Sequence, residues 1–395
     1  MKFIRIGKPH IEHMQTDHAR LVFDLHASDK EEIYPLYYEV NKSYEQYLVT
    51  ELSDAAVVCL LLYAMEYGYD LICESPISER LQHQLTEFLI PAIAKNVSRY
   101  SAIQIHAEGV NIDFAPTAVG TGLSCGVDSF YTVYKGLAHP VGSPLCLTHV
   151  CFFNAGALGM YGGEDARRKY LESCEKFSKV ANKLGLEFLS CDSNMNEYLH
   201  QDHMATHVFR TLSIPLALQK LFSVYYLASG FSYEKFGFSV NSPAKYEILI
   251  LPLLSNQNLR FQEVGGETTR QGKVVYIADF PVPKEHLTVC IGESQNCTHC
   301  RKCKRTMLNL YLIDKLRDYD QVFDVEWFYK HRKKVIRWAM LDYWRADMGE
   351  IIAALRRKHD INIFDYLMVA IMFPFHMAKG FIGKVKFKRK NHAKW

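Results

Sequence analysis

The sequence of 395 residues lacks internal repeats and low-complexity segments, and its formal net charge is only +3. The first absence argues against a repeat architecture, and the small charge gives no reason by itself to expect nucleic-acid binding. Residues 1–6 alternate like a β-strand and lack the apolar core of a signal peptide, so we do not expect export. The eleven cysteines are then expected to be reduced thiols or metal ligands in a cytoplasmic protein.

A chain of this length exceeds one typical hydrophobic core, which predicts two domains and an extension. We expect an N-terminal α+β module at 1–115, an α/β domain at 116–290, a cysteine-rich metal site at 290–310 and a helical extension at 311–395. Nothing in the first module has catalytic spacing, so substrate recognition or dimerisation is its expected role. Its expected elements are strands Phe3–Ile11, Ala19–His26, Ile33–Val40 and Ala102–His106, and helices Tyr44–Tyr67 and Ile77–Val97.

Strand-like and helix-like segments alternate between about residues 116 and 290, which predicts a doubly wound, mostly parallel sheet covered by helices. Ligands of such sheets bind beyond the carboxyl ends of the strands, where the strand order reverses. The turns 124–129, 154–156 and 229–232 are therefore expected to meet there. The expected elements are strands Phe114–Leu123, Pro144–Asn154, Glu187–Cys191 and Val224–Gly230, and helices that start near Phe130, at Glu164–Leu184 and at Leu212–Phe222.

The most informative segment is Gly122–Ser129, which reads Gly-Leu-Ser-Cys-Gly-Val-Asp-Ser. Its small residues place unpaired backbone N–H groups at a helix N-terminus, which favours a bound anion such as phosphate. The hydroxyls of Ser124 and Ser129 add donors, and Asp128 can organise a cation or the loop itself. The Lys-Ser/Thr pair of a Walker A loop is missing, as is the third glycine of a dinucleotide fingerprint. A ligand-free turn and a catalytic Cys125 thiolate are less favoured, the second because a thiolate would repel phosphates.

This segment resembles the Ser-Gly-Gly-x-Asp-Ser signature of the PP-loop ATP pyrophosphatases, in the adenine nucleotide alpha-hydrolase-like superfamily. The resemblance implies a HUP-type fold, with ATP at the loop and Mg²⁺ bridging its phosphate oxygens. It also implies that Phe152 and Asn154 cradle the adenine at the end of the next strand. Cys125 stands where the family usually has its first glycine, and a cysteine fits there if its backbone angles are ordinary. The loop residues implied to contact ATP are Ser124, Cys125, Gly126, Val127, Asp128 and Ser129.

A second segment, 207–212, resembles the Val-Pro-Gly-Arg-Asn segment that opens a helix in the 7-cyano-7-deazaguanine synthases, which are PP-loop enzymes of the queuosine pathway. The match aligns Arg210 with the arginine, and Gly230 resembles the glycine beside the nucleotide's α-phosphate. Asp128, Ser129 and Arg210 are thus the implied catalytic residues.

Two further pairs of basic side chains are minor candidates. His203 and His207 lie one helical turn apart and could face one ligand, although core or surface histidines are the more common case. Arg270 and Lys273 precede an expected last strand and could contact substrate or phosphate.

Four cysteines form the pattern C-x6-C-x2-C-x2-C, at Cys290, Cys297, Cys300 and Cys303. Short loops of this kind wrap around one metal ion, and four thiolates leave no open position, so the site should be structural. Zinc is the expected metal, a four-cysteine iron–sulfur cluster is the main alternative, and unliganded thiols are the least favoured. The synthases have a similar zinc site after their nucleotide domain, so the resemblance covers about residues 120–310.

The extension after residue 310 contains two expected helices and a basic end. Ile351–Lys358 is a short amphipathic helix, and Ile361–Phe375 is strongly apolar but interrupted by Asp365 and Pro374, which makes it a poor transmembrane span. Basic and apolar residues alternate in the run 384–390. A membrane surface, an RNA or an acidic carrier protein could dock there, although a solvated basic tail is the more common case.

These features predict an ATP-dependent enzyme that adenylates a carboxylate or amide oxygen and releases pyrophosphate. Positioning, together with charge neutralisation by Mg²⁺ and Arg210, would promote the attack on the α-phosphorus, and a nitrogen nucleophile such as ammonia would then displace AMP. One alternative uses sulfur as the nucleophile, but no Cys-x-x-Cys pair lies outside the metal motif to carry it. The other is a nucleotide-binding sensor or scaffold without catalysis. We expect the acceptor to be a macromolecule or a specialised metabolite, and a homodimer remains open.

Overall fold

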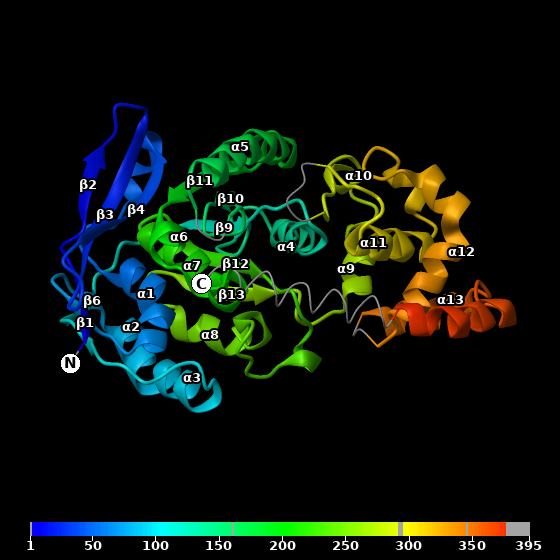
Figure 1. Cartoon of the computed structure of the whole chain (residues 1–395). Coiled ribbons are helices and arrows are strands. Elements are labelled where there is room, and N and C mark those ends of the chain that lie inside the picture. Colours follow the sequence, from blue (N-terminus) through cyan, green and yellow to red (C-terminus); the bar gives the residue numbers. More distant parts are fainter. Residues whose placement is uncertain (1, 160–161, 291–294, 345–346, 377–395) are drawn as a thin grey trace. The chain divides into compact units, whose positions relative to one another are not determined.

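A computed structural model describes residues 2–159, 162–290, 295–344 and 347–376 (Figure 1). The chain forms two compact units, Met1–Thr268 and Thr269–Trp395. This division differs from the expected domains, because strands from both sides of residue 115 share one sheet and residue 290 lies inside the second unit. The basic run 384–390 lies outside the described residues.

The first unit is built on a mixed sheet of eleven strands in the order β13-β12-β9-β10-β11-β4-β3-β1-β5-β7, with β2 paired to β3. Two short strands, β6 (Ile77–Ser78) and β8 (Gly109–Val110), pair separately. The strands of the large sheet are β1 Phe3–Ile6, β2 His10–His13, β3 His18–Ala27, β4 Ile33–Asn41, β5 Asp70–Cys73, β7 Ile105–His106, β9 Ala118–Gly122, β10 His149–Phe153, β11 Glu187–Ser193, β12 Phe222–Ala228 and β13 Arg260–Val264.

The five strands from β9 to β13 are all parallel, which confirms the expected α/β class with a mostly parallel sheet. β10 and β11 extend from one side of β9, while β12 and β13 extend from the other, so the strand order reverses at β9. Such an order is compatible with a doubly wound fold. β9 is buried along most of its length, and Gly120 allows a close approach there, since a Cβ would lie 2.6 Å from the ring of Phe222.

Helices cover this sheet at places that the sequence pattern mostly anticipates. α4 packs on β9 and β12, α5 on β10 and β11, and α8 on β13. The helix at Glu164–Leu184 has the expected bounds and ends at Gly185, which adopts the left-handed conformation (φ 69°) common at helix C-termini. The helices of this unit are α1 Asp54–Tyr67, α2 Glu79–Gln84, α3 Ile90–Asn96, α4 Val127–Leu137, α5 Glu164–Leu184, α6 Met195–Tyr198, α7 His203–Ala217 and α8 Glu247–Leu254.

The expected strand Phe3–Ile11 is divided into β1 and β2, the expected strands Phe114–Leu123 and Pro144–Asn154 are shorter, and three expected helices of this unit have different bounds. The expected helix Tyr44–Tyr67 is a 3₁₀ turn at Lys42–Tyr47 followed by α1, and the expected helix Ile77–Val97 is divided among β6, α2, a π-helical turn at Leu85–Leu89 and α3. The expected helix Leu212–Phe222 is the second half of α7, which begins earlier because the Asp202 carboxylate accepts a hydrogen bond from the N–H of Met204.

A buried polar network joins the N-terminal strands and helices to the parallel strands. The fully buried Asp54 carboxylate accepts hydrogen bonds from the Ser78 N–H (2.8 Å), the Gln219 amide (3.2 Å) and the Asn256 amide (2.9 Å). These partners come from β6, the segment before β12 and the segment before β13. Because buried polar groups must find partners from the same folded unit, the network helps to explain why residue 115 is no domain boundary.

The described part of the second unit contains helices and no strand. The expected last strand after Lys273 is instead the helix α9, which Thr269 caps by accepting a hydrogen bond from the Gly272 N–H. β13 was not expected. The helices are α9 Arg270–Ile277, α10 Pro281–His286, α11 Arg301–Leu312, α12 Val325–Leu341, α13 Met348–Arg357 and a last helix at 363–376.

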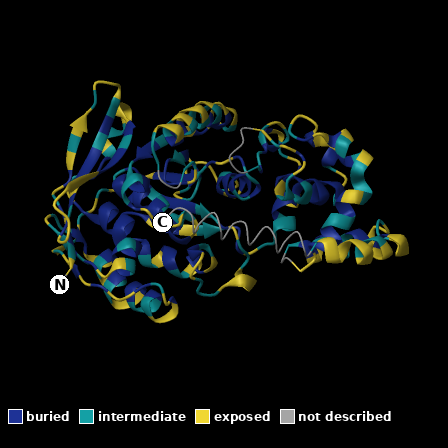
Figure 2. Ribbon diagram, viewed as in Figure 1, coloured by how far each residue is buried: buried dark blue, intermediate teal, exposed yellow. Residues whose placement is uncertain are grey.

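Burial follows these elements (Figure 2). α1 is buried on nearly all sides and forms the core of the first unit together with α7 and the sheet. Among the described helices, none is both long and apolar enough to cross a bilayer.

Candidate functional site

The loop 123–126 leaves the carboxyl end of β9, at the point where the strand order reverses, and leads directly into α4. Gly126 is the N-cap of α4 and offers no side-chain acceptor. The first intrahelical bond runs from the Phe130 N–H to the Gly126 carbonyl (2.9 Å). The backbone N–H groups of the first turn of a helix precede the carbonyls that could accept from them within the helix, so this turn of α4 presents N–H donors toward the loop. This is the local geometry that the sequence predicted for an anion site.

The two serines of the loop have different positions. Ser129 is 4% exposed, and its Oγ accepts a hydrogen bond from the Ser124 N–H (3.1 Å) and donates one to the Gly122 carbonyl (3.0 Å). The Ser129 hydroxyl thus joins the two ends of the loop, because it bonds to the backbone at residues 122 and 124 from the first turn of α4. Ser124 is exposed, and its Oγ accepts from the Gly126 N–H (3.4 Å). Asp128 is half-buried in the first turn of α4.

Cys125 has a left-handed backbone, with φ 54°, so the condition of ordinary backbone angles, under which a cysteine fits this position, is not met. A side chain in this region costs about 1–2 kcal/mol, and glycine is the residue that adopts it without that cost. The thiol is fully buried, and burial raises its pKa to about 12, although Lys176 acts to lower it. The protonated thiol argues against a catalytic thiolate at this position.

The second turn follows β10, which is the neighbour of β9 in the sheet. Asn154 is 3% exposed, and its side-chain amide donates to Asp192 Oδ1 (2.6 Å). The ring of Phe152 stacks on that of Tyr170 with a centroid distance of 5.7 Å, so this side chain packs under α5. Gly156 has φ 105°, and a Cβ there would lie 2.6 Å from the side-chain oxygen of Asn196. The turn therefore needs glycine at this position.

Arg210 lies in α7 and is 1% exposed. Its guanidinium donates to the Asn196 side-chain oxygen (2.8 Å) and to the Leu199 carbonyl (2.6 Å), while its Nε has no hydrogen-bond partner in the described structure. Because Asn196 lies next to Gly156, Arg210 contacts the second turn indirectly, through its hydrogen bond to Asn196. No contact of Arg210 with the loop 123–126 is observed among the described residues.

His203 also lies against the second turn, where its Nδ1 would be 2.8 Å from a Cβ at Gly156. Burial is the main cause that lowers its pKa to about 4, and His207 and Arg210 lower it further. The ring is therefore neutral near pH 7. The centroid distance between the rings of His203 and His207 is 5.6 Å, so the structure does bring this pair together.

A polar cluster that the sequence analysis missed surrounds the carboxyl end of β11. Arg167 of α5 pairs with Asp192 (Nε–Oδ2 3.3 Å) and Glu197 (Nη2–Oε1 2.6 Å) and donates to the hydroxyl of Tyr37 in β4 (2.8 Å). Burial raises the pKa of Asp192, although its bond to Asn154 acts in the opposite direction. Asp192 follows the expected strand Glu187–Cys191 directly, so its place at a strand end was the signal that could have identified it.

The third turn follows β12, the other neighbour of β9. Ser229 is 1% exposed, and its single hydroxyl proton has two acceptors within hydrogen-bond distance, the carbonyl of Phe231 (2.8 Å) and the Glu247 carboxylate. Gly230 is exposed, and a Cβ there would meet nothing within 4 Å. A small cleft lies next to this turn, with Lys245 in its wall. The ends of three adjacent strands thus carry the three turns that were expected to meet. Arg270 and Lys273 instead belong to α9 in the second unit, where Lys273 is 2% exposed.

The four cysteines of the second unit converge on one point, since their sulfur atoms all lie within 4.8 Å of one another. Cys290 Sγ is 3.6 Å from Cys300 Sγ and 3.4 Å from Cys303 Sγ. A tetrahedral ion with metal–sulfur distances of about 2.3 Å places its sulfurs about 3.8 Å apart, so the cluster can hold a single metal ion such as zinc. The cysteine N–H groups at 297, 300 and 303 donate to sulfurs of the cluster. Thr298 adopts φ 63° within the loop, a strained conformation for a β-branched residue.

No protein-family model, curated protein or solved structure matches this chain.

Proposed function

We propose that the first unit binds ATP at the loop 123–129 and uses it to adenylate a carboxylate or amide oxygen, as PP-loop enzymes do. The observation that carries this proposal is the uncapped N-terminus of α4, which follows the central strand where the strand order reverses. Ligands of doubly wound sheets bind at such a point, and phosphates bind at such helix ends. The order β11-β10-β9-β12-β13 supports a HUP-type arrangement of this part of the sheet.

The backbone at residue 125 gives independent support. The resemblance aligns Cys125 with the first glycine of the PP-loop signature, and the left-handed angle there is the kind that glycine adopts readily. A loop that keeps this conformation despite a cysteine stores strain, and strained non-glycine residues are enriched at functional sites.

The residues that would hold the nucleotide differ from the expectation in two respects. Backbone N–H groups at the start of α4 and the exposed Ser124 would contact the phosphates, and Asp128 would lie close to a Mg²⁺ ion, which supplies charge neutralisation when bound. Ser129 would act by holding the loop closed, since its hydroxyl is already bonded twice within the loop. Arg210 would support the turn after β10 through Asn196, which makes it a positioning residue in this arrangement.

A nitrogen nucleophile remains the preferred second reactant. Sulfur transfer needs an accessible thiol or cluster, and every cysteine of the first unit is buried or half-buried. Burial also raises the pKa of several of these thiols, those of Cys73, Cys151 and Cys174 among them. The reaction class would then be AMP-forming ligation in the cytoplasm, with displacement of AMP from the activated oxygen.

A nucleotide-binding sensor is the second candidate function. It is favoured by one observation: two of the three expected catalytic side chains, Ser129 and Arg210, are buried and already hydrogen-bonded within the protein. ATP binding without release of AMP, tested across carboxylate and amide acceptors with and without ammonia, would support the sensor.

The substitution Gly126→Asp tests the ATP site. Gly126 has an extended backbone (φ −81°, ψ 171°) that suits aspartate as an N-cap, so the helix should be as stable or more stable. The new carboxylate would occupy the amides and repel phosphate, and we expect at least a roughly hundredfold loss of Mg-ATP affinity in calorimetric titration.

Thr269→Asp is the matched control, because it also places a carboxylate at an N-cap, that of α9. It should leave ATP affinity unchanged. If Gly126→Asp bound ATP as tightly as the parent chain, the loop would not be the phosphate site.

For the four-cysteine cluster we propose zinc. The four sulfurs are close enough to share one ion, whereas the thiolates of an iron–sulfur cluster bind different iron atoms and need more room. One zinc per chain by elemental analysis, without the visible absorption of an iron–sulfur cluster, is the expected result.

A further inference from the structure

The last described helix, residues 363–376, exposes an unusual amount of apolar surface. Soluble proteins rarely leave so many large apolar side chains of one helix exposed, and such exposure indicates a partner. Figure 2 shows this end of the second unit largely in yellow. The exposed large apolar side chains are Ile363, Phe364, Tyr366, Leu367, Ile371, Met372, Phe373 and Phe375, which are between 38% and 77% exposed.

The helix is fixed to the second unit by a buried carboxylate, so its exposed surface is a built feature. Asp365 is 0% exposed and pairs with Lys333 (Nζ–Oδ2 2.9 Å) and Arg337 (Nε–Oδ1 2.9 Å), both on α12. Its Oδ2 also accepts from the Asn362 N–H (3.1 Å). Asp365 thus faces α12, while apolar side chains such as Leu367 and Ile371 are exposed.

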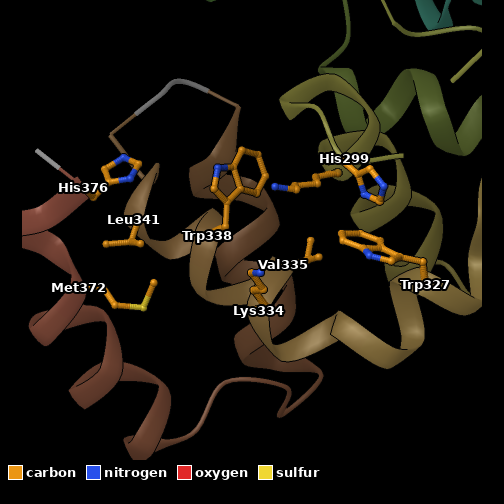
Figure 3. Close-up of a pocket in the computed structure, with 9 residues that line it drawn as sticks. His299, Trp327, Lys334, Val335, Trp338, Leu341, Met372 and His376 are labelled. Carbon is orange, nitrogen blue, oxygen red and sulfur yellow. The ribbon is translucent and has the colours of Figure 1, made fainter. Parts of the chain in front are cut away.

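A cavity of about 450 Å³ lies between this helix and α12 (Figure 3). Trp338 lies in the middle of the view, and Met372 and His376 of the last helix approach Leu341 from one side. The wall carries two lysines and no carboxylate, and Lys304 Nζ lies 5.2 Å from the centroid of the Trp338 ring. The cavity wall therefore combines aromatic side chains with two lysines, Lys304 and Lys334.

Charge is distributed unevenly along the chain. Residues 269–395 contain 25 Lys and Arg against 13 Asp and Glu, a net charge of +12, whereas residues 1–268 contain 21 against 30, a net charge of −9. No acidic residue follows Asp365, and the segment 377–395 contains seven Lys and Arg. The small net charge of the whole chain thus conceals a strongly basic second unit.

We propose that the second unit docks on an anionic phospholipid surface through the helix 363–376. An apolar helix surface next to a basic segment is the combination that binds such membranes, because burial of apolar side chains and attraction to the headgroups act together. Arg337 lies over the ring of Phe364 (5.3 Å) and Arg356 over that of Tyr366 (5.7 Å), so cations stand beside the side chains that would enter the interface. The docking goes beyond the proposed function, since it concerns the other unit.

Two other occupants fit the surface less well. A second copy of the chain could cover the apolar side chains but would bring two units of charge +12 together, which is repulsive. A nucleic acid would neutralise the charge but leave Leu367 and Ile371, which are 58% and 63% exposed, without apolar contact.

Vesicle flotation of the full chain tests the docking. We expect binding to phosphatidylcholine vesicles that contain about 30 mol% phosphatidylserine, little binding to phosphatidylcholine alone, and weaker binding when salt is raised from about 0.1 M to about 0.5 M. Ile371→Asp should lower the binding at least about tenfold, since it places a charge in the apolar surface. Val141→Asp is the matched control, because Val141 is a 99% exposed apolar residue of the first unit.

Equal binding to both vesicle types, no binding, or equal losses in the two variants would overturn the proposal. A concentration-dependent dimer that Ile371→Asp dissociates, without vesicle binding by the parent chain, would instead assign the surface to a second copy. Salt-sensitive binding of a single-stranded oligonucleotide without vesicle binding would assign the unit to nucleic acid. Zinc content should be the same in all variants and serves as the check on folding.

Discussion

The left-handed backbone at Cys125 allows a test, because it should reverse the usual order of stability between an alanine and a glycine substitution. At ordinary buried positions glycine is less stable than alanine, by about 0.5–1 kcal/mol, because the unfolded chain gains freedom. At φ 54° alanine keeps the steric cost of its Cβ, which is about 1–2 kcal/mol, while glycine does not. We therefore expect Cys125→Gly to be more stable than Cys125→Ala by about 0.5–1 kcal/mol. Both variants lose the buried thiol, so that loss cancels in the comparison.

Cys59 provides the matched control, since it is also a buried cysteine but lies inside α1. There we expect the normal order, with Cys59→Ala more stable than Cys59→Gly by about 1 kcal/mol. The difference between the two sites should thus reach about 1.5–2 kcal/mol, which is several times the usual error of denaturant titrations.

Urea unfolding followed by far-UV circular dichroism is the assay for this comparison, with tryptophan fluorescence as a second probe. All four tryptophans follow residue 268, so their fluorescence reports the second unit and should show the same transition in every variant. Alanine more stable than glycine at position 125 would refute the left-handed loop. If the loop binds ATP as proposed, Cys125→Gly should also keep the affinity for Mg-ATP within about threefold, since glycine is the family's residue there.

Two further predictions concern the metal and the pH dependence. Removal of the metal by a chelator, or the substitution Cys303→Ser, should unfold the second unit while the first unit keeps its urea midpoint. The fluorescence of Trp327 should change, because its ring contacts that of His299 in the cysteine loop. An unchanged second unit would contradict a structural metal. The pKa of His203 is lowered from 6.5 to about 4 in the folded chain. Between these pH values the unfolded chain binds more protons than the folded chain, so the folded state is favoured less as the pH falls. The free energy of unfolding should therefore decrease by up to about 3 kcal/mol between pH 6.5 and pH 4. Urea midpoints at several pH values should show this fall, and His203→Gln should reduce it; an equal fall in that variant would show that other groups cause it.

The sequence predicted the elements that carry their own periodicity. Four of the five parallel strands, α4 and α5 follow from alternating or helical apolar patterns, whereas β13 was not expected. The cysteine cluster follows from spacing, because short loops leave few ways to place four thiols. The position of the loop 123–126 at the reversal of strand order followed from the alternation of strands and helices alone. The backbone angle of Cys125 did not, since φ depends on how the closed loop is held by Ser129.

What the sequence could not give is determined by contacts between distant segments. Asp54 accepts hydrogen bonds from Gln219 and Asn256, which lie more than 160 residues further along the chain. The residues next to Asp54 in the sequence give no indication of these partners. The β11–β4 pairing is similar, because it joins Ser193 to Tyr38 across more than 150 residues. The pattern of apolar and polar residues in either strand does not indicate which other strand it pairs with.

These distant contacts change the role that the N-terminal segment can have. Tyr37 of β4 accepts a hydrogen bond from Arg167, which pairs with Asp192, and Asp192 in turn accepts one from Asn154 in the turn after β10. A segment that the sequence separates as an accessory module is therefore connected, through three polar contacts, to one of the turns of the proposed nucleotide site. In a buried series of hydrogen bonds, removal of one member weakens the bonds of the others. Tyr37→Phe should therefore make the turn after β10 more mobile and leave the conformation of the loop 123–126 unchanged. We expect a modest loss of ATP affinity, about two- to fivefold, as one neutral hydrogen bond is worth about 0.5–1.5 kcal/mol and acts here only indirectly; a variant that binds ATP like the parent chain would show that the N-terminal strands support the sheet and not the site.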